Sequence, residues 1–331
     1  MIDVHSASQP QRLLSAPAAS PPARVSDGGR TRAWQYVIGD YIALTKPRVI
    51  SLLLLTTAAA MFITPAGAPA WYLVLWTMIG GYLMAGGANA VNMAYDSDID
   101  RVMGRTSLRP TSQGRISARR AYVFGFALAS LSLVVFVLFV NVLTAALALA
   151  GFVYYTVIYT AWLKRRTWHN IVIGGGAGAI PALVGWAAAS SQITWPSLLL
   201  FAIVFYWTPP HFWALALMKR QDYARARVPM LPVIAGEAET ARQIGSYSIL
   251  LVILSLAPSA FGLMGWLYLI GALALGGVLL ARAWRLWLQF RATSSEPVSA
   301  RPTAARLYKY SLFYLASLFV CMVVDRATAW L

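Results

Sequence analysis

Charged residues are scarce in this chain of 331 residues, and acidic ones are scarcer than basic ones. Charged side chains make up 11 % of the sequence and hydrophobic ones 59 %, whereas a soluble domain carries about 25 % charge. So little charge excludes both a water-soluble fold and a disordered chain. The single cysteine, Cys321, excludes an internal disulfide framework, a structural zinc site and an iron–sulfur cluster. The composition therefore indicates a polytopic membrane protein.

The first 35 residues lack the long apolar stretches that follow. They are rich in Ser, Ala, Pro and Arg, and they contain neither the apolar core nor the cleavage site of a secretory signal. We expect residues 1–35 to form a disordered cytosolic tail and residues 36–331 to form a transmembrane domain. A mitochondrial transit peptide is less favoured, because Asp3, Asp27 and several prolines oppose a basic amphipathic helix.

The rest of the chain contains apolar stretches that are long enough to cross about 30 Å of hydrocarbon. A spanning segment must satisfy its own backbone hydrogen bonds, and no alternating pattern of a β-barrel is present. The sequence therefore predicts an all-α protein with about nine transmembrane helices. The predicted spans are residues 47–65, 71–94, 120–140, 142–162, 169–189, 196–217, 245–263, 265–284 and 307–325.

Basic residues concentrate on one set of connections. By position, 26 of the 27 lysines and arginines lie in the N-terminal segment or after the second, fourth, sixth and eighth predicted spans, and only Arg326 lies on the other side. Because Lys and Arg gather in cytoplasmic loops, we expect a cytosolic N-terminus and an external C-terminus. The formal charge of +16 then requires no nucleic acid partner. We expect a bacterial plasma membrane rather than the mitochondrial inner membrane.

Oxygen-bearing side chains recur where the second predicted span ends. Asn92, Asp96 and Asp100 follow one another at intervals of four residues, which places them on one face of a helix, whereas Asp98 points elsewhere. Carboxylate and amide oxygens along about 12 Å of helix suit a hard cation such as Mg²⁺.

Taken alone, these acids could equally form salt bridges at the membrane edge with Arg101, Arg105 and Arg109. The basic loop that follows them, RVMGRTSLRP, and the basic residues of the other cytosolic loops favour a different interpretation. A magnesium diphosphate needs carboxylates for the metal and Arg or Lys for the phosphate oxygens.

The NxxxDxxxD pattern resembles the first aspartate-rich motif of the UbiA-type intramembrane prenyltransferases. Other segments narrow the resemblance to the branch that modifies haem, and together they cover residues 44–233. The matching segments are LTKPRV at 44–49, NAVNMAYDSDIDRVMGRTSLRP at 89–110, YTAWLKRRTWHNIVIGGGAGAIPALVGW at 159–186, WTPPHFWALAL at 207–217 and DYARARVPMLPV at 222–233.

The resemblance implies helices around a central cavity and a cytosol-facing site that opens sideways to lipid. It implies transfer of a farnesyl group from farnesyl diphosphate to a vinyl group of protohaem IX, with addition of water, for haem–copper oxidase biogenesis. Haem A synthase or oxidase assembly proteins would be its partners, besides membrane lipid. The expected ligands of Mg²⁺ are Asn92, Asp96, Asp100 and Asp222; those of the diphosphate are Lys46, Arg48, Arg105, Arg109, Lys164 and Arg165.

The second acidic motif departs from the family pattern. The wider superfamily has DxxxD, but here Asp222 is followed four positions later by Ala226, and Gln221 precedes it where an acid is common. One firm acid therefore remains in this motif. The competing interpretation of Asp222 is a salt bridge with Arg225 at a helix end.

His211 is the only histidine in the interior of a predicted span, since His169 is the first residue of the span at 169–189. It is expected either to contact haem, as an axial ligand or polar anchor, or to be a hydrogen-bonded packing residue. Pro209 and Pro210 beside it are expected to break and widen the helix. The glycine run at 174–176 lies in an apolar span without a preceding strand, so it indicates close helix packing or room for a flat ligand rather than a phosphate loop.

Two rival functions remain at this point. One is a related prenyltransferase that acts on a phenolic or quinone-precursor acceptor. The segments at 207–217 and 222–233 argue against it only because they resemble the branch that modifies haem. A transporter or a non-catalytic haem-oxidase assembly factor belongs to another class. A transporter is expected to show internal repeats and polar groups near the midplane, whereas the acids here lie at predicted helix ends.

Overall fold

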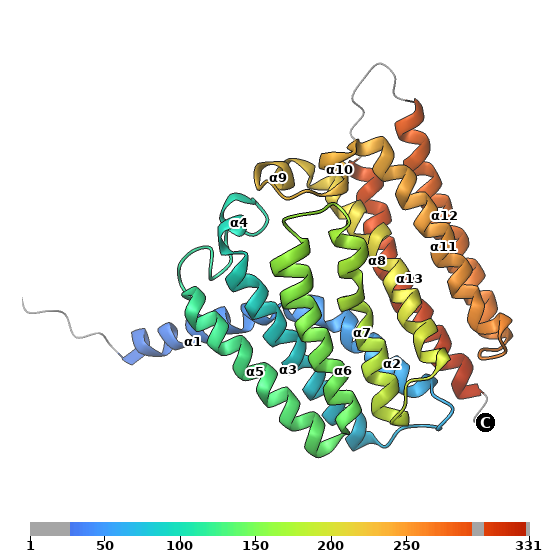
Figure 1. Ribbon diagram of the computed structural model, residues 1–331, viewed down its shortest axis with the longest axis horizontal. Helices are drawn as coiled ribbons and strands as arrows, with labels where there is room; N and C mark the ends of the chain where they lie inside the picture. The colour runs from blue at the N-terminus through green and yellow to red at the C-terminus, as the bar shows by residue number, and fades with distance from the viewer. Residues whose placement is uncertain (1–26, 293–300, 329–331) are drawn as a thin grey trace, which may run out of the picture. The chain divides into compact units, whose positions relative to one another are not determined.

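The computed structural model describes residues 27–292 and 301–328, and within these ranges every regular element is helical (Figure 1). The chain divides into two units, residues 1–39 and residues 40–331. The second unit contains all the sites described below. The prediction of an all-α fold is confirmed.

The long helices correspond to the predicted spans. Eight of the described helices are long and apolar enough to cross a membrane, and a ninth span results if the bent pair Gln35–Thr45 and Pro47–Ile63 is counted as one. The chain is therefore a multi-pass membrane protein. The long elements are α2 (Pro47–Ile63), α3 (Trp71–Tyr95), α5 (Ala118–Phe139), α6 (Val142–Val153) with the π-helix η1 (Tyr154–Leu163), α7 (Asn170–Ser190), α8 (Trp195–Met218), α11 (Gly236–Ala260), α12 (Trp266–Ala292) and α13 (Arg301–Thr328).

A helix that the sequence pattern did not predict precedes the first span. Helix α1 (Asp27–Thr45) begins inside the segment expected to be a disordered tail, whose residues 1–26 lie outside the described ranges. Lys46 separates α1 from α2 with a left-handed backbone, φ 56°, and the two helices meet at a bend of 47°. Asp40 near the end of α1 accepts two hydrogen bonds from the Arg115 guanidinium. This ion pair fixes the end of α1 to the loop before α5.

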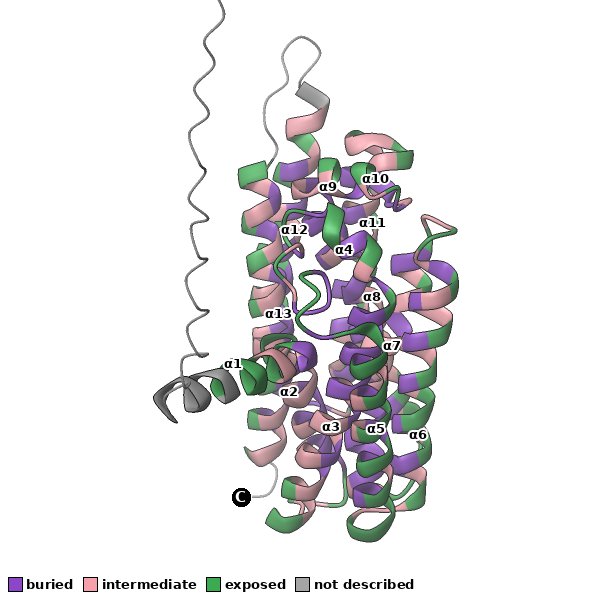
Figure 2. Ribbon diagram, turned by 90° about the vertical axis from the view of Figure 1, so that its left-hand side faces the viewer, coloured by how far each residue is buried: buried purple, intermediate pink, exposed green. Residues whose placement is uncertain are grey.

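Three short helices lie at one end of the bundle. Helix α4 (Ser97–Val102) continues from α3, while α9 (Arg220–Arg225) and α10 (Leu231–Ile234) connect α8 to α11. Both ribbon views place α4 and α9 at the same end (Figures 1 and 2). The motif after α3 and the motif after α8 therefore meet, although they are far apart in sequence.

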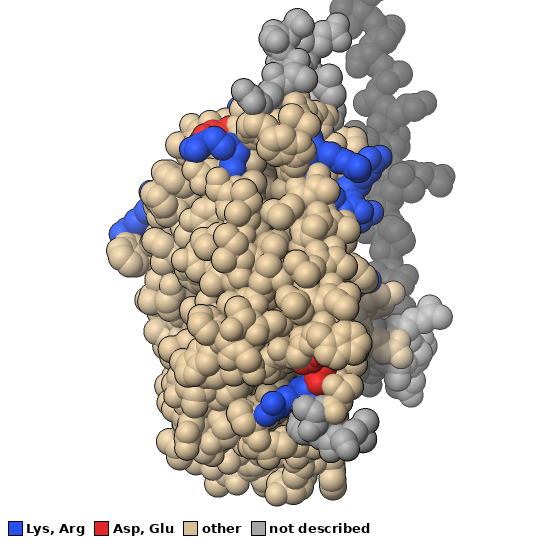
Figure 3. All heavy atoms as spheres, turned by 90° about the vertical axis from the view of Figure 1, so that its right-hand side faces the viewer, with Lys and Arg blue, Asp and Glu red and all other residues tan. Residues whose placement is uncertain are grey.

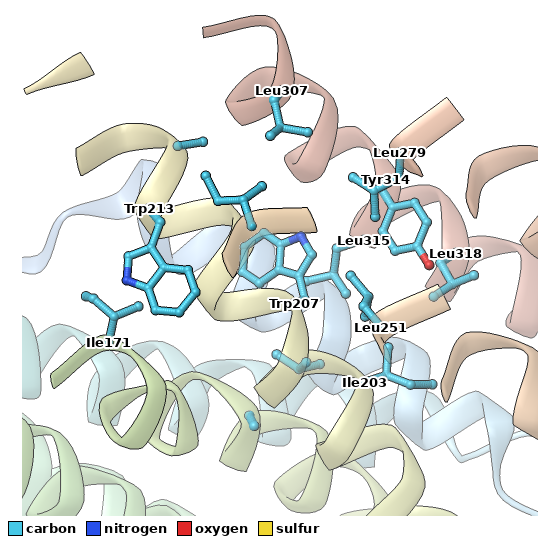
Figure 4. Close-up of a cluster of buried hydrophobic side chains, with 14 of the residues drawn as sticks. Ile171, Ile203, Trp207, Trp213, Leu251, Leu279, Leu307, Tyr314, Leu315 and Leu318 are labelled. Carbon is cyan, nitrogen blue, oxygen red and sulfur yellow. The ribbon is translucent and has the colours of Figure 1, made fainter. Parts of the chain in front are cut away.

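Helices α7 and α8 form the centre of the bundle. In the most apolar 18-residue stretch of each, 61 % is buried inside the protein, whereas the share is 28 % in α5, in α12 and in the α6–η1 segment. Figure 2 shows the corresponding exposed residues along α5 and α6. Trp207 of α8 lies beside Leu315 of α13 (Figure 4), and its Nε1 donates a 2.7 Å hydrogen bond to the Ser311 carbonyl. The outer helices therefore present apolar side chains to lipid around a packed centre.

Small residues allow the helices to approach closely. A Cβ atom placed on Gly87 of α3 would lie 2.5 Å from the Gly125 carbonyl oxygen of α5. On Gly185 of α7 it would overlap the Thr57 carbonyl of α2. Helices in lipid associate through such close packing, because lipid tails are as apolar as the side chains they contact.

The expectation that Pro209 and Pro210 break their helix is wrong. Helix α8 runs without interruption from Trp195 to Met218 with both prolines inside it. Both are buried between neighbouring helices, as are Trp207 and Thr208. Packing on all sides therefore holds this segment helical although the prolines remove two backbone donors.

Charged residues occupy the ends of the bundle. On the face seen in Figure 3, lysines and arginines gather at the upper end, a small acidic and basic patch lies at the lower end, and a broad uncharged band separates them. This distribution matches a hydrocarbon layer between two polar surfaces.

Substitution of Gly185 by Ala tests the close crossing of α2 and α7. The added methyl group would meet the Thr57 backbone, so we expect a loss of about 1–3 kcal/mol in unfolding free energy. Gly178→Ala in the same helix meets nothing within 4 Å and should be neutral or slightly stabilising. Thermal unfolding of the detergent-purified variants measures the difference, and equal effects at both positions would contradict the crossing geometry.

Candidate active site

Helix α3 ends where its acidic motif begins. Tyr95 is its last residue, Asp96 forms the junction and Ser97 begins α4. Helical hydrogen bonding still continues through the junction, from the Asp96 amide to the Asn92 carbonyl at 2.9 Å and from the Asp100 amide to the Asp96 carbonyl at 2.8 Å. The predicted common face of Asn92, Asp96 and Asp100 therefore survives the interruption. All three side chains are buried, whereas Asp98 points to the surface.

Asn92 and Asp96 are the centre of a buried polar network. The Asn92 amide donates to Asp96 Oδ2 at 2.8 Å and to Thr160 Oγ1 at 3.0 Å. Its oxygen accepts a 2.9 Å hydrogen bond from Lys46 Nζ. Lys164 Nζ forms an ion pair with Asp96, which has no exposed surface. Three segments distant in sequence thus contribute to one charged cluster.

Arginines pair with the neighbouring acids. Arg109 Nη1 lies 2.6 Å from Asp100 Oδ2, and Arg165 forms two 2.8 Å hydrogen bonds to the exposed carboxylate of Asp98. The Arg165 hydrogen bonds hold the pKa of the Asp98 carboxyl below its ordinary value. Arg165 Nη2, one of the two nitrogens that bond Asp98, also lies 3.7 Å from Asp96 Oδ1. Arg165 therefore connects the exposed acid to the buried one.

The π-helix η1 carries aromatic and hydroxyl groups to this cluster. Thr160 Oγ1 donates to the Tyr155 carbonyl at 2.7 Å, which fixes the hydroxyl that accepts from Asn92. The rings of Tyr155 and Tyr159 stack with centroids 5.6 Å apart. Tyr155 lies within electrostatic range of Asp96, Asp100 and Arg109. A wider helical turn, as π-helices provide at functional sites, thus presents several groups toward one side.

The glycine run in α7 makes room for this segment. A Cβ on Gly174 would overlap the Tyr159 ring, and one on Gly176 would lie 3.1 Å from the Tyr154 ring. A Cβ on Gly175 would lie 3.0 Å from the Cβ of Thr208 in α8. Of the two expectations for this run, close helix packing is therefore confirmed.

The second motif lies opposite the first. Asp222 pairs with Arg225, and its Oδ1 is 3.9 Å from the Cβ position of Gly104 in the loop after α4. Arg105 in that loop faces the buried hydroxyl of Tyr223. Burial raises the pKa of this hydroxyl above its ordinary value, although Arg105 opposes the rise. A cavity of about 340 Å³ separates α4 from the chain after α9. Its lining residues are Asp98, Ile99, Val102, Arg165, Arg225, Ala226, Arg227 and Val228.

The donors near Asp96 fit a magnesium ion. Asp96 Oδ1 is buried without a hydrogen-bond partner, so one carboxylate oxygen remains available. Among the described residues, no three histidine, cysteine or acidic side chains lie close enough together to hold a metal. Mg²⁺ does not require such a cage, because it is commonly bound by one or two carboxylates together with substrate phosphates and water. Asp96 and Asp100 are two such carboxylates, and Asp222 does not form a three-residue ligand cluster with them among the described residues.

His211 lies apart from the acids, between α8 and α13. Its ring stacks on Trp207 and Tyr308, with centroids at 4.3 and 4.6 Å. His211 Nδ1 lies 2.8 Å from Ser311 Oγ, which donates its own hydrogen to the Tyr308 carbonyl. This network assigns the ring proton to Nδ1. Nε2 has no partner within the described ranges.

Most of the predicted phosphate ligands lie at one end with the acids, but not all are linked to them. Lys164, Arg165 and Arg109 contact the acidic side chains, whereas Lys46 donates to the Asn92 amide oxygen and Arg105 faces Tyr223. Arg48 is exposed, and the structure gives it no ion pair with a described residue. Thr160 and Tyr223 were not predicted as site residues. Thr160 lies four positions before Lys164, and this helical spacing is the only sequence signal that could have found it.

Buried acids that face lysines and arginines at one end of a helical membrane bundle are typical of a functional site within a membrane protein. The UbiA prenyltransferase family model matches residues 53–301, and the chain belongs to this family. A solved UbiA homologue from Archaeoglobus fulgidus, bound to DMAPP and Mg²⁺, has a TM-score of 0.62 at 18 % identity. The match covers 86 % of this chain and 99 % of that one, which shows the shared fold.

Curated relatives make the resemblance more specific. The chain is 58 % identical over 89 % of its length to a protoheme IX farnesyltransferase from Chloroflexus aurantiacus, of which it covers 49 %. It is 49 % identical over 87 % of its length to a protoheme IX farnesyltransferase from Deinococcus radiodurans, of which it covers 93 %. The chain thus spans about half of the first relative and nearly all of the second.

The hydrogen bond from Asn92 to Thr160 predicts a role for Thr160 in orienting the amide. Thr160→Val should raise the apparent Kd for Mg²⁺ about tenfold, as removal of a group that orients a metal ligand does. The measurement is the shift in thermal unfolding caused by Mg²⁺ added with inorganic diphosphate. Thr156→Val is the matched control, because Thr156 bonds only to the Phe152 carbonyl of its own helix. Equal effects of the two variants would contradict the role of Thr160.

Proposed function

We propose that this protein transfers a farnesyl group from farnesyl diphosphate to a vinyl group of protohaem IX, with addition of water, and so forms haem O. The observation that carries the proposal is the pair of buried carboxylates, Asp96 and Asp100, each with a basic partner in a membrane-embedded bundle. The names of the relatives support haem as the acceptor. A cluster of this kind suits a diphosphate head whose isoprenoid tail lies in the hydrocarbon layer.

In this proposal the acidic side chains bind the metal ion and the basic side chains bind the phosphate oxygens. Asn92, Asp96 and Asp100 would hold Mg²⁺, with Asp222 approaching from the opposite motif. When bound, the metal neutralises the diphosphate and stabilises it as a leaving group. Lys164 and Arg165 pair with Asp96 and Lys46 donates to Asn92, so the donors of all three can turn to phosphate oxygens. We place Arg48, Arg105 and Arg109 around them as further phosphate ligands.

The transfer begins when the allylic C–O bond breaks and its electron pair leaves with the diphosphate. The stacked rings of Tyr155 and Tyr159 can stabilise the positive charge on the farnesyl carbon through their faces. The π-electrons of the haem vinyl group then form the new C–C bond, which moves the positive charge to the haem side chain. Water adds to that carbon and loses a proton, which leaves a hydroxyethylfarnesyl group.

His211 supplies a contact for haem in this proposal. Ser311 holds Nδ1 and the stacked rings of Trp207 and Tyr308 fix the plane, which leaves Nε2 as the unprotonated nitrogen. A histidine whose other ring nitrogen is held by a hydrogen bond is the usual arrangement of an iron ligand. Its position away from the acids is consistent with separate regions for haem and diphosphate.

The charge distribution supports an orientation. Because 26 of the 27 basic residues belong to the N-terminal segment and one set of loops, we place the N-terminus and the acidic site at the cytosolic face of a bacterial plasma membrane. The product would leave within the membrane toward haem A synthase or proteins that assemble haem–copper oxidases.

The proposed reaction is tested by the mass of haem in membranes that contain the expressed chain, haem and farnesyl diphosphate. Wild-type protein should give haem heavier by one farnesyl group plus one hydroxyl group, because the added water loses a proton. Asp96→Asn should reduce this product about 100-fold or more, because the amide lacks the charge that binds the metal. Asp98→Asn should retain product within about threefold, because an exposed ion pair contributes little.

The outcomes also separate the rival functions. Prenylation of a phenolic acceptor with unchanged haem would identify a related prenyltransferase. Absence of any prenylated product from folded protein would favour a transporter or an assembly factor. Greater sensitivity of Asp98 than of Asp96 would refute the assignment of the metal face.

The haem contact is tested separately by His211→Ala. We expect weaker haem binding and a changed absorption spectrum of the haem-loaded protein, while binding of farnesyl diphosphate persists. If His211 served only packing, its loss would leave Ser311 with an unpaired group, lower stability by about 1–3 kcal/mol and weaken both ligands together. An unchanged spectrum with normal turnover would remove His211 from the site.

A further inference from the structure

A second cavity lies at the opposite end of the bundle from the acidic site. It is bordered by the end of α2, the C-terminal half of α7, the start of α8, the connection from α11 to α12 and the end of α13. Its volume is about 90 Å³, and its walls are mostly apolar, with Ile63, Leu200, Met264 and Met322 among them. Since a water molecule occupies about 30 Å³ in the liquid, this space accommodates one small group rather than a whole lipid or haem.

Two donors in the wall have no acceptor. Trp186 is 3 % exposed and its Nε1 is buried without a hydrogen-bond partner. Arg326 Nε is also buried without a partner. Both residues line the cavity. An unpaired buried donor loses its hydration without compensation, so two donors in one small cavity point to an acceptor that occupies it.

Asp325, the acid next to Arg326 in the sequence, binds the start of another helix. Asp325 uses both carboxylate oxygens on the start of α12: Oδ2 accepts from the Gly265 amide at 2.6 Å and Oδ1 from the Tyr268 amide at 3.0 Å. Arg326 forms no ion pair with an acid in the described part of the chain, where all ion pairs involve other basic residues. A guanidinium beside an apolar cavity therefore retains its full positive charge.

The cavity lies at the level of the membrane surface. Trp195 and Phe261, which pack edge to face with centroids 5.3 Å apart, are exposed at this end, as is Trp266 at the start of α12. Exposed tryptophans at helix ends are typical of the boundary between hydrocarbon and lipid headgroups. The charged patch at the lower end of Figure 3 lies beyond the uncharged band, in agreement with this depth.

We propose that this cavity binds the phosphate group of an anionic membrane lipid. The guanidinium of Arg326 would pair with the phosphate, and Trp186 Nε1 would donate to a phosphate or ester oxygen deeper in the cavity. The acyl chains would remain outside, along the apolar surface of the helices. The site is independent of the proposed transferase activity, because it shares no residue with the acidic cluster.

Native mass spectrometry of the full chain, purified in detergent and titrated with phosphatidylglycerol or phosphatidylcholine, tests the proposal. We expect the wild-type protein to retain phosphatidylglycerol about tenfold more strongly than phosphatidylcholine, as one charge-assisted hydrogen bond allows. Arg326→Gln should abolish this preference. Trp186→Phe removes only the N–H and should weaken phosphatidylglycerol binding severalfold without loss of thermal stability.

Arg119→Gln is the matched control, because Arg119 is an exposed arginine at the start of α5, at the other end of the bundle. It should leave the lipid preference unchanged. Equal loss of preference in Arg119→Gln and Arg326→Gln would show general charge attraction and overturn the proposal. Retained preference in both Arg326→Gln and Trp186→Phe would also overturn it, as would displacement of the lipid by millimolar inorganic phosphate.

Discussion

A carboxylate buried in a membrane protein must be neutralised, and the ion pair between Asp96 and Lys164 meets this requirement. Asp96 has no exposed surface, and loss of one partner from such a buried pair costs about 3–5 kcal/mol. The pair joins the end of α3 to the end of η1, and Asn92 extends it to Lys46 and Thr160. The positions of three helix ends thus depend on the neutralisation of one charge.

The same requirement links stability to the proposed chemistry. Lysines and arginines that neutralise carboxylates are also the groups that bind phosphate oxygens. A magnesium diphosphate brings its own cation for the acids and its own anions for the bases. The site can therefore exchange internal pairs for substrate pairs while the buried charge stays balanced. Lys46 has a left-handed backbone, a conformation that residues other than glycine rarely adopt. This conformation places its ammonium group on Asn92, within the cluster proposed to bind the diphosphate.

The bundle separates two polar regions by an apolar layer, and each region has its own chemistry. At one end, acids and bases form the buried cluster at which we propose that a diphosphate binds. At the other end, an unpaired arginine and an unpaired indole line a small cavity among exposed aromatic side chains. Close contacts between small residues, such as Gly185 against Thr57, keep the helices that connect these ends in a fixed arrangement.

The sequence by itself determined the class of the protein, its spans and the acidic motif. Low charge, long apolar stretches and one-sided loop charge are local properties, and helical hydrogen bonding kept Asn92, Asp96 and Asp100 on one face as their spacing predicted. Tertiary structure alone brought Lys164 to Asp96 and Arg165 to Asp98, because these pairs join residues about seventy positions apart, whereas Arg109 and Arg225 are close in sequence to the acids that they meet. It also kept α8 helical through Pro209 and Pro210, because packing against α7 and α13 outweighed the local preference of proline. The partnerless donors of Trp186 and Arg326 have no sequence signal at all, since a missing partner is a property of the surrounding helices.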